Sequence, residues 1–167
     1  MIKIGSNISK FSAYSCQPRT KKELQDIIKS RVSNEGPKCN LNDIDTSLMT
    51  DMSSMFAYSL FNGDISKWDV SNVKDMWGMF QYSLFDGDIS DWNVSNVKDM
   101  SGLFNEPKFN QDISKWNVSN VTNMDYMFTD SEFDQDISNW KINEKCEIYD
   151  IFAGCRIRNE YKPKSLQ

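Results

Sequence analysis

The sequence contains no histidine, the side chain that most often serves as a general acid or base and as a metal ligand. Its four cysteines show no Cys-x-x-Cys spacing, so a zinc site is not expected. Free thiols are favoured for all four, with a Cys146–Cys155 disulfide as the alternative in an oxidising compartment. We therefore expect no catalytic residues, no metal and no cofactor.

Long hydrophobic runs are also missing, so no membrane span is expected. The N-terminal segment has no apolar stretch of the kind found in secretory signals, which predicts a cytoplasmic location. A cell-surface location is the alternative if the chain is a fragment or is exported by another route. Acidic residues outnumber basic ones, and the net charge of −5 argues against a nucleic-acid partner because phosphate binding needs clustered Lys and Arg.

What the chain does contain is a repeat of 24 residues. Residues 57–80 and 81–104 are identical at 18 of 24 positions. Such a period predicts a solenoid whose units bury their apolar faces only by stacking, and it favours a binding surface over a catalytic pocket. The repeated aromatic positions, which we expect in the core, are Trp68, Trp92, Trp116 and Trp140, with Phe61, Phe85, Phe109 and Phe133, and Phe56, Phe80, Phe104, Phe128 and Phe152.

The segment before the repeats carries a helix signature. Thr20 and Glu23 form a capping box, apolar residues follow at helical spacing, and Gly36-Pro37 ends the pattern. We expect this helix to cover the open end of the first coil. The predicted organisation is an N-terminal segment with a capping helix (1–39), one half and four full repeats (40–155), and a basic C-terminal tail (156–167).

Within one repeat, two patterns predict two elements. The spacing of Ile65, Trp68 and Val70 indicates a short strand, and the apolar positions from Val73 to Phe80 indicate a short helix. Gly63 is expected to supply a turn conformation. The predicted fold is an α/β repeat: a right-handed, leucine-rich-repeat-like solenoid of short parallel strands and short helices.

The repeats resemble a known family. The segments DISKWDVSNVKDM, DISDWNVSNVKDM and DISKWNVSNVTNM are similar to the BspA-like surface-protein repeats, first catalogued as a mycoplasma protein family of unknown function. The resemblance covers residues 40–152, and the TKKEL helix extends it to about residue 20. It implies a leucine-rich-repeat-like solenoid in bacterial proteins, many of which bind host or matrix proteins, and it implies no catalytic residues.

The predicted strands would direct polar side chains outward. Their columns vary between repeats as a binding face would, although a solvated sheet face is the favoured explanation. The candidate binding residues on this face are Lys67, Asp69, Asp91, Asn93, Lys115 and Asn117.

A second candidate surface contains Trp77 and Tyr82. Trp77 stands where Ser53, Ser101 and Asp125 stand in other repeats, so it is either a local packing feature or an exposed contact anchor. The aspartates at Asp64 and its equivalents suggest calcium ligands, but capping of their own turns is the favoured interpretation.

These patterns predict a non-enzymatic, monomeric protein-interaction module that presents a polar sheet face to a protein partner. The alternatives are an intracellular inhibitor of a cytosolic protein and a structural fragment of a larger surface adhesin.

Overall fold

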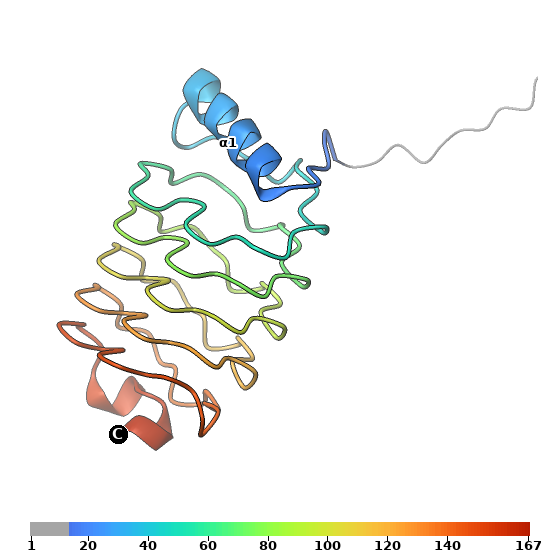
Figure 1. Ribbon diagram of the computed structural model, residues 1–167. Helices are drawn as coiled ribbons and strands as arrows, with labels where there is room; N and C mark the ends of the chain where they lie inside the picture. The colour runs from blue at the N-terminus through green and yellow to red at the C-terminus, as the bar shows by residue number, and fades with distance from the viewer. Residues whose placement is uncertain (1–13) are drawn as a thin grey trace, which may run out of the picture.

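The computed structural model describes residues 14–167, and within them the repeats form coils that stack one on the next (Figure 1). The start of the predicted 1–39 segment, up to residue 13, lies outside the described residues. Helix α1 (Lys21–Glu35) lies across one end of the stack. At the other end the chain finishes in two short 3-10 helices, η1 (Asn159–Tyr161) and η2 (Lys164–Leu166).

The predicted N-terminal helix is confirmed as α1. The Glu23 N–H donates to the Thr20 hydroxyl at 3.1 Å, while the Glu23 carboxylate accepts from the Arg19 N–H at 2.7 Å. Leu24 and Ile28 are buried against the first coil. The helix therefore shields the apolar end of the stack from water, as a terminal cap must.

The predicted α/β solenoid of parallel strands and short helices is wrong. Residues 14–167 contain no β-strand, and α1 is their only α-helix. Neighbouring coils meet instead through isolated parallel bridges, four of which form one column with a single residue from each coil. That column is Asp51, Asp75, Asp99, Asn123 and Glu147.

The strand prediction fails because each predicted strand is folded into turns by its own side chains. The Asp64 carboxylate accepts from the Ser66 N–H at 3.0 Å, and the Trp68 N–H then donates back to the Ile65 carbonyl at 3.1 Å. Such side-chain bonds to the main chain offer the backbone an alternative to a sheet ladder. The same turn is present at Asp88, Asp112 and Asp136.

The predicted short helix is replaced by what we term the turn ladder, residues 52–58 and their equivalents 76–82, 100–106, 124–130 and 148–154. Two positions in each ladder segment have positive φ, for example Gly78 (56°) and Tyr82 (52°), and left-handed residues cannot continue a right-handed helix. Alternate N–H groups therefore point toward the next coil. They donate from Met52 to Asp75, Ser54 to Trp77, Phe56 to Met79 and Tyr58 to Gln81, at 2.8–2.9 Å.

The core residues follow the predicted columns, except that Phe152 in the last coil is only partly buried. The Trp side chains of the repeats are 3–5% exposed and the Phe positions of the middle coils are fully buried. The rings of Phe56, Phe80 and Phe104 stack from coil to coil, with centroids 5.6 and 5.8 Å apart. Apolar burial between coils is thus the main force holding the stack together.

The C-terminal residues 156–167 pack on the last coil. Ile157 is buried, and the Tyr161 carbonyl accepts from the Ile137 N–H at 3.0 Å. Arg158 pairs with Asp134 at 3.1 Å, so part of the tail's positive charge is neutralised on the preceding coil. The four cysteines of the chain are free thiols.

Candidate functional site

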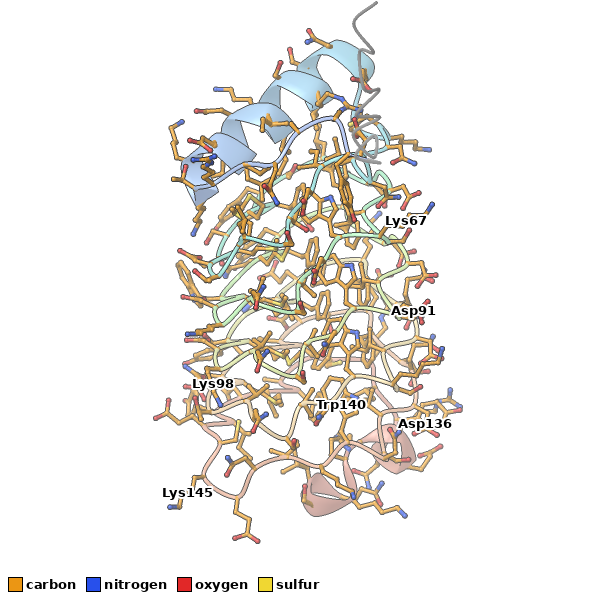
Figure 2. All side chains as sticks on the ribbon, turned by 90° about the vertical axis from the view of Figure 1, so that its right-hand side faces the viewer. Lys67, Asp91, Lys98, Asp136, Trp140 and Lys145 are labelled. Atoms are coloured by element: carbon orange, nitrogen blue, oxygen red, sulfur yellow. The ribbon has the colours of Figure 1, made fainter. Side chains whose placement is uncertain are left out.

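The predicted polar residues lie on one side of the stack, although no sheet supports them. Lys67 and Asp91 are exposed one coil apart in the same column, on the side opposite Lys98 (Figure 2). Lys115 continues this column, and its ammonium lies 3.5 Å from the Asp91 carboxylate. Because both side chains are highly exposed, this pair contributes little to stability.

The next polar column is engaged within the fold. The side-chain oxygens of Asp69, Asn93 and Asn117 each accept the N–H two residues further on, at 2.9–3.2 Å. These three side chains therefore shape turns, and a partner meeting this side would find mainly Lys67, Asp91 and Lys115 unobstructed.

Trp77 and Tyr82 lie on the turn ladder, in a different segment of the coil from Lys67. Trp77 is 51% exposed, which matches the predicted outward orientation. Tyr82 stacks on Tyr58 with centroids 4.9 Å apart, and its hydroxyl bonds to Glu106, which raises the pKa of the tyrosine. The structure thus separates the two groups of sequence-predicted residues.

Among the exposed leucines that the sequence reasoning missed, two follow the ladder tyrosines. Leu60 is 69% and Leu84 43% exposed, and each lies two residues beyond a ladder tyrosine. We define the tyrosine–leucine patch as Tyr58, Leu60, Tyr82 and Leu84. The signal was present in the repeat alignment, because the equivalent pairs in the next two coils are charged, Glu106 with Lys108 and Asp130 with Glu132.

A groove adjoins this patch where α1 crosses the first coil. We name this space of about 590 Å³ the helix groove. Met55 and Ala57 are among the residues that line it. Their carbonyls accept no hydrogen bond from residues 14–167, whereas the equivalent carbonyls of Met79 and Gln81 accept from the preceding coil. The groove is lined by Gln25, Ile28, Lys29, Val32 and Ser33 of α1 and by Met55, Phe56, Ala57, Tyr58 and Ser59.

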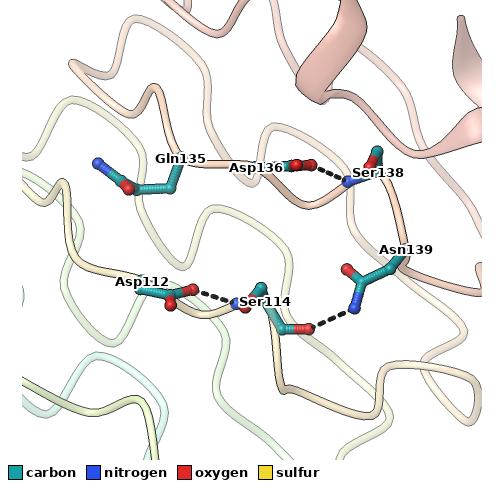
Figure 3. A pocket seen from close by; sticks show the side chains of 6 residues that line it. All are labelled: Asp112, Ser114, Gln135, Asp136, Ser138 and Asn139. Carbon is teal, nitrogen blue, oxygen red and sulfur yellow. Dashed lines mark hydrogen bonds between the residues drawn. The ribbon is translucent and has the colours of Figure 1, made fainter.

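A shallow polar hollow lies on the side of the aspartate turns (Figure 3). The Asp112 and Asp136 carboxylates accept from the N–H groups of Ser114 and Ser138, and these backbone bonds lower the pKa of both carboxyls. Asn139 donates to the Ser114 carbonyl at 3.0 Å. Within the described part of the chain, no group of three or more Cys, Asp or Glu is arranged to hold a metal. The aspartates therefore act as turn caps here.

No helix of residues 14–167 has the length and hydropathy of a membrane span. The model of one family, described as Mycoplasma protein of unknown function, DUF285, matches the chain over residues 25–108 and again over residues 81–162. Together the two matches run from α1 through the coils into the C-terminal segment. No curated protein and no solved structure matches the chain.

Proposed function

This chain belongs to the family described as Mycoplasma protein of unknown function, DUF285, and we propose that it is a non-enzymatic module that binds a protein partner. The similarity of its repeats to those of BspA-like surface proteins is in keeping with this role. Its binding surface is the tyrosine–leucine patch together with the helix groove, and not the polar side of the stack.

The observation that carries the proposal is that the exposed side chain at equivalent ladder positions changes from one coil to the next while the backbone conformation stays the same. Tyr82 and Glu106 occupy equivalent ladder positions with φ of 52° and 55°. The backbone therefore accepts a charged residue at this place, and folding alone does not require tyrosine there. Exposed tyrosines are typical of interfaces because their rings combine apolar area with a hydroxyl group. An apolar patch confined to the first two coils thus indicates selection for contact.

The helix groove defines the chemistry of the partner. The open carbonyls of Met55 and Ala57 need N–H donors, which an extended segment of a partner chain supplies in the manner of an added strand. Ile28 and Val32 offer apolar walls, and Tyr58 continues the surface outward. We therefore expect the partner to insert a main-chain segment that carries apolar side chains.

The experiment is an affinity capture with the folded protein, identification of the partner by mass spectrometry, and titration of that partner against three variants. Tyr82→Glu with Leu84→Lys copies the residues of the next coil, so it should leave the fold intact. Loss of these contacts should weaken binding at least tenfold, which corresponds to about 1.4 kcal/mol.

The control variant is Lys67→Glu with Lys115→Glu, which changes only the polar side and should leave affinity within about threefold. A third variant, Lys29→Glu, places a negative charge at the helix groove. If the polar-side variant abolishes binding while the patch variant binds normally, the proposed surface is wrong.

A further inference from the structure

The helix groove lies at the end of the turn ladder where two carbonyls lack the donors that every later coil has. At each boundary between coils, the last two N–H donors of one ladder segment bond to two carbonyls of the next, at 2.7–3.1 Å. The first donor is always a phenylalanine, and the second is the residue two positions further on. Met55 and Ala57 carry the corresponding carbonyls of the first segment, and no backbone N–H of residues 14–167 bonds to them.

The second donor has the same backbone conformation at all four boundaries. Its φ is 57° at Tyr58, 52° at Tyr82, 55° at Glu106 and 53° at Asp130. Three kinds of side chain thus share one left-handed conformation, so the conformation belongs to the ladder pairing and not to the side chain. A segment that pairs with Met55 and Ala57 in the same way needs a left-handed residue as its second donor.

Glycine is the residue that meets this need in a separate segment. Within the coils, the surrounding fold holds Tyr, Glu and Asp in the left-handed conformation. A partner segment has no such support, so an L-residue there would weaken binding about five- to thirtyfold, the equivalent of roughly 1–2 kcal/mol. Glycine adopts positive φ without this penalty.

The walls of the helix groove determine the rest of the segment. The Phe56 ring is only 1% exposed, so an incoming side chain meets the half-buried Val32 and the exposed Tyr58 instead. Lys29 is exposed, and it is the one charged residue among the described residues that line the groove. An acidic residue in the partner segment would complement it.

We propose that the helix groove binds a partner segment of the form apolar–x–glycine with a neighbouring acidic residue, an inference that rests on the proposed function. The segment runs parallel to residues 55–57, as successive coils do. The N–H of its apolar residue donates to the Met55 carbonyl, and the N–H of its glycine donates to the Ala57 carbonyl. Its apolar side chain packs against Val32 and Tyr58, and its carboxylate pairs with Lys29.

The test is a peptide series titrated against the full chain and followed through the backbone amide signals of residues 55–59. The first peptide is acetyl-Glu-Val-Ala-Gly-Ser-amide, and it should shift these signals saturably with a Kd of about 1 mM. Replacing its glycine by D-Ala, which favours positive φ, should keep this affinity, whereas L-Ala should weaken it five- to thirtyfold. Equal affinity of the D-Ala and L-Ala peptides overturns the proposal, as does the absence of a saturable shift with the glycine peptide.

Two variants of α1 localise the binding. Ser33→Trp fills the helix groove and should weaken the glycine peptide at least fivefold. Ser30→Trp places the same side chain on the same helix but outside the groove lining, so it should leave the affinity unchanged. Normal binding to Ser33→Trp would place the peptide elsewhere and overturn the proposal. The comparison of D-Ala with L-Ala needs no variant, so it decides the matter even if Ser33→Trp fails to fold.

Two further outcomes separate this proposal from its alternatives. If the signals of residues 55–59 shift with protein concentration in the absence of peptide, the groove binds a second copy of this chain and the proposal is overturned. If the patch variant Tyr82→Glu with Leu84→Lys weakens the captured partner but the peptides show no preference for D-Ala, the proposed surface is right and the motif is wrong. A preference for D-Ala with no effect of the patch variant supports the motif and contradicts the proposed function.

Discussion

The indole N–H of Trp92 donates to the main-chain carbonyl of Ile65, one coil earlier, at 3.2 Å. The same bond joins Trp116 to Ile89 and Trp140 to Ile113, at 3.1 and 3.2 Å. Each tryptophan therefore fills the core of its own coil and donates a second hydrogen bond to a carbonyl of the preceding coil, which already accepts the N–H three residues further on. One side chain thus performs both packing and hydrogen bonding across the coil boundary.

This bond predicts a graded response at position 92. Trp92→Ala should lower the free energy of unfolding by about 3–5 kcal/mol through the cavity it leaves. Trp92→Phe retains most of the packing and removes one of the two hydrogen bonds that the Ile65 carbonyl accepts, so it should cost only about 0.5–1.5 kcal/mol. Trp77→Ala, on the surface, should cost less than about 1 kcal/mol. Urea denaturation of the three variants measures these values, and equal losses at positions 77 and 92 would contradict the assignment of inside and outside.

Because α1 caps the stack, substitutions on its buried face should lower the stability of the protein more than substitutions on its exposed face. Leu24→Ala removes a fully buried side chain between the helix and the first coil, so it should destabilise by about 2–4 kcal/mol. Lys29→Ala lies on the exposed face of the same helix and should change stability by less than about 0.5 kcal/mol. Thermal and urea unfolding check both. Similar curves for the two variants would mean that α1 does not seal the stack.

Gly102 has a positive φ of 59°. The stability of variants at this position should therefore depend on the shape of the new side chain and not on its size alone. Gly102→Val places a β-branched residue in a left-handed conformation and should destabilise by about 1–2 kcal/mol. Gly102→Asn should cost less, because asparagine adopts this conformation more readily. Denaturation midpoints decide the matter, and an equal cost for both substitutions would show that strain at this position is unimportant.

The aspartate turns predict a loss of stability in acid. Backbone N–H donors lower the pKa values of Asp64, Asp88, Asp112 and Asp136 in the folded protein. Their stabilising effect is therefore complete above the unfolded pKa of about 3.9, and it is lost as the pH falls through the lower folded values. Urea midpoints should hold steady from neutral pH down to about pH 5 and then decline.

A matched control exists for this effect, because the chain itself uses asparagine in the same kind of turn at Asn93 and Asn117. Replacing Asp88 and Asp112 by Asn keeps an acceptor oxygen but removes the titrating group. The variant should remain folded at neutral pH and show a smaller decline in acid. An unchanged decline would assign the acid sensitivity to other carboxyl groups.

The sequence predicted which residues lie inside and what covers the first coil, because both follow from apolar periodicity and capping chemistry. It did not predict the backbone between the core positions. The spacing of Ile65, Trp68 and Val70 fits a strand, but Asp64 two residues before Ser66 produces a turn. The sequence analysis favoured turn capping by Asp64 and its equivalents, and yet it assigned the residues that follow to a strand because their apolar spacing fits one.

The left-handed positions were harder to foresee. The sequence reasoning gave the turn role to Gly63, whereas the positive φ values belong to Gly78 and Gly102 and to residues such as Tyr58 and Tyr82. Gly63 instead allows close approach, since an added Cβ would lie 2.0 Å from the Cys39 carbonyl oxygen. Tyrosine rarely adopts a left-handed conformation, so no local preference indicates it. The same limit applies to the site. Trp77 was identified because it breaks the repeat and Tyr82 as an aromatic residue that could join it, while the helix groove depends on the packed position of α1.

The turn ladder also has a dipole along the axis of the stack. Its coil-to-coil hydrogen bonds all run the same way, with each N–H directed toward the last coil and each carbonyl toward the first. The aligned peptide dipoles therefore add along the stack, as they do along the axis of an α-helix. The first coil is the negative end, where the Lys21 ammonium pairs with Asp51 at 3.0 Å, and the last coil is the positive end. The ladder thus has two ends of opposite polarity, which the coil-to-coil bonds beside it, such as that from the Lys74 N–H to the Thr50 carbonyl, partly offset.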